Sequence, residues 1–209
     1  MNFFSSLLTI TTLIILVSTD TRYNEALKHL KDVEGFRTIG EHPTLKSGVF
    51  IGIGIDLGKQ TKSSLLTKGI HSSIISKVEK YLGYKSKIHL EYAGLKASDL
   101  VLTTEEAENI SKPFFTKSYY DALPYTANMN DKAASVLVSL RYWTGSLNCN
   151  DCQLSVLVNQ INTNYLWLAI KEKNADRSAM YASLLRTIIY IPSTSLTYKR
   201  FYQEIIYLN

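Results

Sequence analysis

Two carboxylates, Glu34 and Asp56, flank a glycine-rich segment, and their spacing makes them the best candidates for chemistry in this sequence. Cleavage of a glycosidic bond requires one carboxylic acid to protonate the leaving oxygen and a second carboxylate to activate water or attack directly. We expect Glu34 at the end of a helix and Asp56 near the end of a hairpin, so that the two face each other across a cleft. Glycines at 52 and 54 let a sugar chain or a neighbouring backbone approach closely.

Both carboxylates also have an ordinary structural interpretation. A Glu-Gly pair at a helix end is more often a solvated terminus, and an Asp after a strand is more often a cap. The residue types alone therefore do not decide for catalysis, and the elements around them have to be considered.

Two predicted elements position these carboxylates. Residues 22–33 carry apolar side chains at helical spacing, which predicts an amphipathic helix. That helix should end at Glu34-Gly35, because Gly commonly terminates helices. Residues 36–57 are punctuated by Pro43 and several glycines and are rich in β-branched residues towards their end, which predicts a small hairpin sheet with tight turns.

The rest of the chain is predicted to be helical. Further candidate helices cover residues 72–82, a segment opened by a capping pattern at 103–106, and residues 131–142, 153–173, 175–190 and 198–207. Residues 131–142 are apolar nearly all round and should form the central core helix. No internal repeat or long linker divides the sequence. We therefore predict a single α+β domain over residues 20–209, with a small N-terminal β-hairpin sheet packed beside a mainly helical lobe.

Residues 1–19 have the character of a signal peptide. They carry no charged side chain, and their apolar stretch, Leu7 to Val17, is about half of the roughly 20 residues that a spanning helix needs. The alternatives are an uncleaved anchor or a buried N-terminal helix. The signal-peptide interpretation predicts a secreted protein with no stable membrane insertion after cleavage.

Composition limits the class of protein and its partners. The chain has 209 residues, 45% of them apolar and 20% charged, enough for a real core and not typical of disorder. The formal net charge of +5 favours an anionic partner. The basic residues form no run of five or six, so no nucleic-acid partner is indicated. We expect a monomer.

The remaining chemistry-bearing residues receive structural interpretations. Cys149 and Cys152 suit a loop disulfide in an oxidising compartment, or else two free thiols, because no βαβ pattern or second pair supports a redox or zinc site. Asn109 begins an Asn-Ile-Ser sequon. Four histidines lack metal-ligand spacing and are expected to be solvated or locally bonded: His29, His42, His71 and His89. Four tyrosines at helical spacing are expected to pack in the core: Tyr119, Tyr120, Tyr181 and Tyr190.

The segments Glu34 to Arg37 and Ser47 to Gly58 together resemble the phage-type lysozyme superfamily, closest to its pesticin-like branch of muramidases. That family has Glu-Gly at the end of its first helix, then a hairpin reading Ser-Gly-Val-Thr-Ile-Gly-x-Gly-x-Asp-Leu-Gly. This chain reads Ser-Gly-Val-Phe-Ile-Gly-Ile-Gly-Ile-Asp-Leu-Gly. A looser similarity continues at Leu102 to Glu108, Tyr142 to Gly145 and Pro192 to Glu204.

The resemblance implies a role for three residues. Glu34 matches the general acid, and Asp56 matches the carboxylate that positions water or stabilises the cationic sugar. Arg200 is a supporting candidate that would orient the catalytic Glu. The implied substrate is the β-1,4 bond after N-acetylmuramic acid in bacterial peptidoglycan, with no metal and no organic cofactor.

Phe50 departs from the family pattern, which has Thr at this position. Phenylalanine offers neither donor nor acceptor, so it cannot anchor the attacking water, and orientation supplies up to roughly 7–11 kcal/mol of a barrier. Glu41 is a further carboxylate that would be an alternative base. Three hypotheses stay open: a secreted antibacterial muramidase, a degenerate lysozyme-like protein that binds glycan without cleaving it, and an unrelated secreted structural protein. Whether cleavage inverts or retains depends on the carboxyl separation.

Overall fold

The computed structural model describes residues 21–127, 129–144, 184, 194 and 196–209. The chain divides into two compact units: unit 1 contains residues 1–29 and 118–209, and unit 2 contains residues 30–117. Several predictions lie outside the described residues: the signal peptide, the helix at 153–173, the helix at 175–190 apart from Leu184, Cys149, Cys152, Tyr181 and Tyr190.

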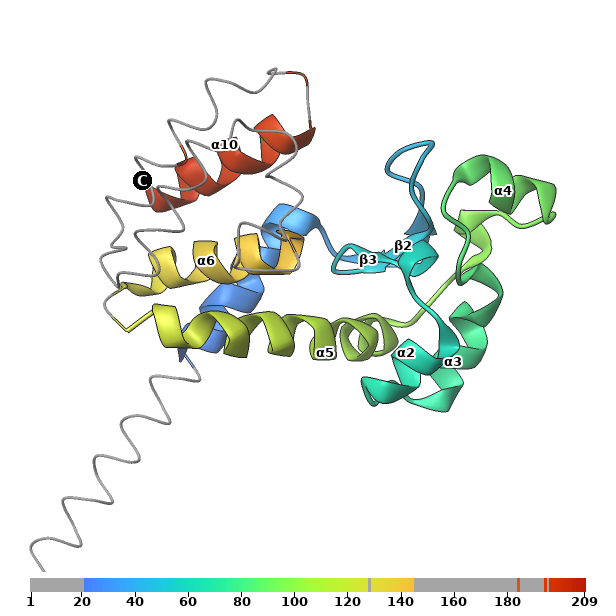
Figure 1. The fold of residues 1–209 in the computed structure, drawn as a ribbon, viewed down its shortest axis with the longest axis horizontal. Coiled ribbons are helices and arrows are strands. Elements are labelled where there is room, and N and C mark those ends of the chain that lie inside the picture. Colours follow the sequence, from blue (N-terminus) through green and yellow to red (C-terminus); the bar gives the residue numbers. More distant parts are fainter. Residues whose placement is uncertain (1–20, 128, 145–183, 185–193, 195) are drawn as a thin grey trace, which may run out of the picture. The chain divides into compact units, whose positions relative to one another are not determined.

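Unit 2 combines a small sheet with short helices (Figure 1). Its elements are β1 (Arg37–Glu41), β2 (Phe50–Gly52), β3 (Ile55–Asp56), the 3-10 helix η1 (Leu57–Lys59), α2 (Lys62–Thr67), α3 (Ser72–Val78), η2 (Glu79–Tyr81), α4 (Lys87–Tyr92), η3 (Ala97–Asp99) and the first part of α5 (Thr104–Ala122). A helix over residues 21–34 begins in unit 1 and ends in unit 2. The expected first helix, hairpin sheet and α+β class are confirmed.

The sheet is antiparallel with the strand order β1-β2-β3. Ile51 pairs with Ile55 across the hairpin, and both side chains are buried. Because side chains alternate between the two faces of a strand, the neighbouring pair Phe50 and Asp56 occupies the opposite face. One face of the sheet therefore packs against the core, and the other face carries Phe50 and Asp56.

Most of the buried apolar side chains of unit 2 form one cluster: Val49, Ile51, Ile55, Leu57, Leu65, Ile70, Ile74, Ile75, Val78, Tyr81, Leu90, Leu100, Leu102, Ala107 and Ile110. Sequence patterning missed α2 and α4. Each has only six residues and a single buried one, Leu65 or Leu90, so no helical period can be recognised. Their N-termini are fixed instead by caps from Thr61 and Ser86.

The start of α5 follows the predicted capping pattern. Thr103 Oγ1 accepts a hydrogen bond from Glu106 N (3.1 Å), while Glu106 Oε2 accepts one from Thr103 N (2.9 Å). Lys77 Nζ donates to both carboxylate oxygens of Glu106, at 2.7 and 2.8 Å. The bond from Lys77, followed by that from Thr103, holds the pKa of Glu106 below its usual value.

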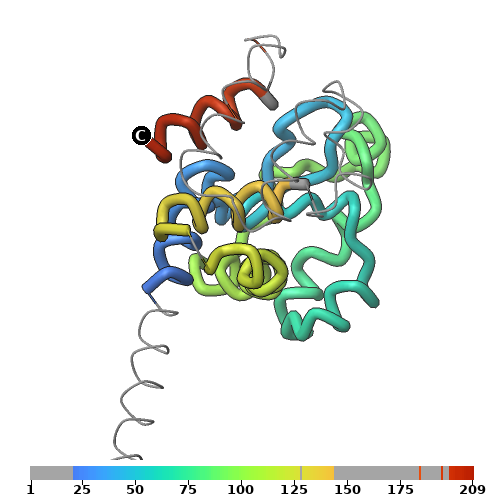
Figure 2. Tube along the Cα trace, turned by 60° about the vertical axis from the view of Figure 1, so that its left-hand side comes forward, coloured from blue at the N-terminus to red at the C-terminus, as the bar shows by residue number. Residues whose placement is uncertain are grey.

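Unit 1 is helical in its described part. It contains the end of α5, η4 (Leu123–Tyr125), α6 (Asp131–Thr144) and α10 (Leu196–Leu208), which packs along α6 (Figures 1 and 2). The expected core helix is confirmed as α6, whose buried apolar residues are Ala133, Ala134, Val136, Leu137, Val138 and Leu140. Tyr119 is buried as expected, but Tyr120 is 57% exposed, a correction to its predicted core position. Its ring meets only the edge of that core, packing against Tyr119 at 5.6 Å between centroids.

A buried polar network joins the helices of unit 1. His29 Nε2 lies 2.6 Å from Glu204 Oε2, although the two residues are 175 positions apart in the sequence. Glu204 Oε1 also accepts hydrogen bonds from Ser139 Oγ (2.7 Å) and Arg200 Nε (3.0 Å). His29 is therefore neither solvated nor locally bonded, which corrects the prediction. The guanidinium and the hydroxyl compensate for burial of the Glu204 carboxylate.

Tyr81 provides a test of the unit 2 core. Its side chain is fully buried, and its hydroxyl has no hydrogen-bond partner among the described residues. An unsatisfied buried hydroxyl costs about 1–3 kcal/mol. We expect Tyr81→Phe to raise the free energy of unfolding by about 1 kcal/mol, measured by chemical denaturation. Tyr92→Phe, at an exposed position, is the control and should change nothing; a loss of stability in Tyr81→Phe would contradict the assignment.

Candidate active site

Glu34 ends the first helix and lies against the hairpin turn. Gly35 follows it with φ +75°, a conformation that stops the helix and favours glycine. The Glu34 side chain is partly exposed. A Cβ atom added at Gly54, which has φ +68°, would lie 3.0 Å from Glu34 Oε2. Glycine at 54 therefore serves the close approach of the turn to the carboxylate.

The other side of this turn is held by α5. Ser111 Oγ accepts a hydrogen bond from Ile53 N (2.9 Å) and donates one to Ala107 O (2.7 Å), and all three residues are buried. A Cβ atom added at Gly52 would lie 2.1 Å from Ser111 Oγ. Glycine at 52 thus allows α5 to approach the turn closely.

Three side chains stand in a row across the outer face of the sheet. Glu41 on β1 pairs with Phe50 on β2, and Phe50 pairs with Asp56 on β3. Directly opposite residues on neighbouring strands place their side chains on the same face. In the register of the sheet, Phe50 therefore lies between two residues that carry carboxylates. The side chain of Glu41 is 59% exposed, whereas that of Asp56 is 13% exposed.

Asp56 is engaged by its own loop. Its Oδ1 accepts a hydrogen bond from Gly58 N (2.9 Å) and so caps η1. A Cβ atom added at Gly48 would lie 2.3 Å from the same oxygen. Its Oδ2 lies 3.9 Å from Lys59 Nζ. Glycine at 48 thus makes room for the Asp56 carboxylate.

Arg37 links the helix end to the row. Its Nη1 donates to the carbonyl oxygen of Glu34 (2.6 Å), and its Nε donates to Glu41 Oε2 (2.8 Å). A guanidinium can hold two acceptors at once in a fixed geometry. Sequence reasoning quoted Arg37 without a role and missed Ser111. The one available signal for Arg37 was its spacing of three and four residues from the two glutamates.

The other predicted site residues lie elsewhere. Arg200 belongs to unit 1, where it donates hydrogen bonds to Glu204 Oε1 and, from Nη2, to Ser139 Oγ (2.6 Å). Its role towards Glu34 stays a prediction. Asn109 is exposed on α5. Within the described ranges, no cluster of three or more His, Cys, Asp or Glu side chains is placed to hold a metal ion. No helix in that part of the chain is long and apolar enough to cross a membrane.

Comparison with known families adds to this geometry. The family model described as "Pesticin: Bacterial toxin homologue of phage lysozyme, C-term" matches residues 28–164, about two thirds of the chain. This chain belongs to the pesticin family. The match includes the helix end at Glu34, the whole sheet and Ser111, and ends before Arg200. The resemblance noted in the sequence is confirmed. A comparison of this pesticin-family chain with curated proteins found no match.

Ser111 provides the test of how the turn is held. Ser111→Ala removes the acceptor of the Ile53 N–H in a buried place, and we expect the free energy of unfolding to fall by about 1–3 kcal/mol. Thermal and chemical denaturation measure the change. Ser76→Ala is the matched control, because its hydroxyl makes the same bond to the carbonyl four residues earlier (3.0 Å) at an exposed position. Equal losses in the two variants would contradict the special role of Ser111.

Proposed function

We propose that this chain is a secreted muramidase that hydrolyses the β-1,4 bond after N-acetylmuramic acid in bacterial peptidoglycan and thereby acts against bacteria. The observation that carries the proposal is a partly exposed Glu34 at the helix end, beside a sheet face with two further carboxylates, in a pesticin-family chain. Family membership supports a lysozyme-type glycoside hydrolase. The predicted signal peptide and the net charge of +5 support secretion and an anionic cell-wall target.

In the proposed mechanism, Glu34 is the general acid that protonates the leaving glycosidic oxygen. Its backbone carbonyl is held by Arg37 and its carboxylate is bordered by Gly54, so both ends of the residue are positioned. Positioned general acids contribute typically ~10²–10⁴-fold to a rate. The cationic sugar that develops in the transition state requires a second carboxylate nearby.

Two carboxylates compete for the second role. The resemblance to the family implies Asp56, whose Oδ1 caps η1 and whose side chain is largely buried. The exposed fraction favours Glu41, which reaches solvent and is oriented by the Arg37 guanidinium that also holds Glu34 O. We assign Glu41 the water-facing role, and Asp56 the support of the loop beside it.

Three isosteric variants test this assignment in a reducing-sugar assay on purified peptidoglycan. We expect Glu34→Gln to lower the rate by about 10²–10⁴-fold, because the amide cannot donate the proton. Glu41→Gln should lower it to a similar extent. Asp56→Asn keeps an oxygen that can cap η1 and should retain most of the activity.

Each variant is checked by thermal denaturation and by a pull-down with insoluble peptidoglycan, so that lost chemistry is separated from lost folding or binding. Loss of activity in Asp56→Asn with Glu41→Gln active would return the second role to Asp56. A wild type that binds peptidoglycan but releases no reducing ends would contradict the enzymatic proposal.

The second candidate function is a lysozyme-like module that grips glycan without cleaving it. The observation that favours it is the position of Phe50, directly between the two carboxylates of the row. An aromatic ring there occupies the place where a hydroxyl would hold water, and aromatic faces suit contact with sugar rings. The two candidate functions share the substrate and differ only in cleavage.

Phe50→Thr separates the two functions. We expect the threonine hydroxyl to hold water beside the carboxylates and to raise the cleavage rate about tenfold, equal to about 1.4 kcal/mol of barrier. Phe50→Ala is the control, because it removes the ring without adding a hydroxyl. Activity in Phe50→Thr alone, with none in the wild type, would favour the binding module. An unchanged rate in Phe50→Thr would show that Phe50 does not limit cleavage.

A further inference from the structure

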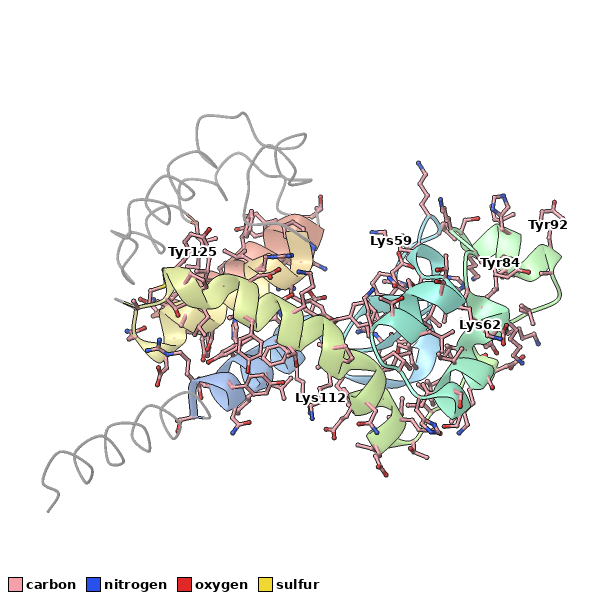
Figure 3. All side chains as sticks on the ribbon, turned by 60° about the horizontal axis from the view of Figure 1, so that its bottom comes forward. Lys59, Lys62, Tyr84, Tyr92, Lys112 and Tyr125 are labelled. Carbon is pink, nitrogen blue, oxygen red and sulfur yellow. The ribbon has the colours of Figure 1, made fainter. Side chains whose placement is uncertain are left out.

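Three large apolar side chains are exposed on α4 and on the loop that contacts its start. Leu45 is 66% exposed, Ile88 54% and Tyr92 87%. Ile88 and Tyr92 are four residues apart on α4 and share one face of that helix. Lys87 N donates to Leu45 O (3.2 Å), so the loop that carries Leu45 lies against the start of α4. Figure 3 shows the Tyr92 side chain projecting at the outer edge of unit 2.

Exposed lysines lie in the same segments as these apolar side chains. Lys46 follows Leu45, and Lys85 lies three residues before Ile88; both are exposed, and neither has an ion-pair partner among the described residues. Lys59 joins them because Gly83 N donates to Leu57 O (3.2 Å), which ties η1 to the segment before α4. We call Leu45, Lys46, Lys59, Lys85, Ile88 and Tyr92 the α4 patch.

Two carboxylates, one on α4 and one that pairs with a lysine of the α4 patch, each have a lysine partner. Glu91 Oε1 is 3.7 Å from Lys87 Nζ, and Asp56 Oδ2 is 3.9 Å from Lys59 Nζ. His89 is also exposed on α4. The uncompensated charge of the α4 patch therefore comes from Lys46 and Lys85 and is positive.

We propose that the α4 patch is a peripheral docking surface for an anionic lipid bilayer. Exposed aliphatic and tyrosine side chains enter the interfacial layer of a bilayer, while lysines beside them pair with lipid phosphates. Binding of an anionic polymer would explain the lysines, but it would not explain why the apolar side chains of Leu45 and Ile88 are exposed beside them. The binding is reversible adsorption of a folded surface.

Vesicle co-sedimentation tests the proposal. The probes are vesicles of phosphatidylglycerol with phosphatidylcholine, and vesicles of phosphatidylcholine alone. We expect the protein to bind the anionic vesicles and to be released as salt rises, because exposed charges are screened. Lys46→Gln with Lys85→Gln should weaken binding about fivefold for each lysine. Ile88→Ser with Tyr92→Ser should weaken it about tenfold or more.

Matched controls come from other surfaces of the chain. Lys112→Gln removes from α5 one exposed lysine that, like Lys46 and Lys85, has no ion pair among the described residues; it is labelled in Figure 3. Leu66→Ser with Tyr120→Ser removes two similarly exposed apolar side chains. α2 lies across unit 2 from α4 (Figures 1 and 2). All proteins carry the same N-terminus, so differences report on the α4 patch, and these controls should bind as the wild type does.

The outcomes separate this proposal from the proposed enzymatic function. Glu34→Gln should bind vesicles like the wild type, whether or not it has lost activity. Equal binding to both kinds of vesicle, or patch variants that bind like the controls, would overturn the proposal. It would also be overturned if the lysine variants lost binding to a purified anionic wall polymer while binding to anionic vesicles stayed unchanged.

Discussion

The hydrogen bond from Ile53 N to Ser111 Oγ is the contact on which the geometry of the candidate site depends. It ties the tip of the hairpin to α5, and the hydroxyl itself is anchored to the carbonyl of Ala107. Close contact on both sides of the tip requires glycine, at 52 against Ser111 and at 54 against Glu34. The turn that α5 holds on one side borders the Glu34 carboxylate on the other, which is the kind of positioning that the proposed general acid requires.

The two faces of the sheet carry different kinds of side chain. Ile51 and Ile55 close the core, and the alternation of side chains sends Phe50 and Asp56 to the other face. There Phe50 separates two carboxylates, so the family's missing hydroxyl would have been at the centre of the row. In the proposed mechanism, the departure at this one position affects how water is held, while the sheet itself still forms.

Local sequence patterns correctly predicted those elements that depend on contacts between residues close together in the chain. The end of the first helix at Glu34, the hairpin, the cap at Thr103 and the apolar helix α6 all depend on contacts between near neighbours in the chain. Short helices with one buried residue escaped prediction, because a single apolar side chain has no period. Tyr120 was misplaced because helical spacing indicates which residues share a face and does not indicate which face is covered.

The sequence by itself determined the family, the hairpin and the residue types available for chemistry, because the glycines and carboxylates of the motif act over a few residues. Only the tertiary structure decided how each carboxylate is placed. Asp56 caps its own loop while Glu41 reaches solvent, and their exposed fractions follow from packing. The pairing of His29 with Glu204 was likewise beyond any local pattern, because burial brings together groups that are 175 residues apart and requires that their polar atoms be satisfied.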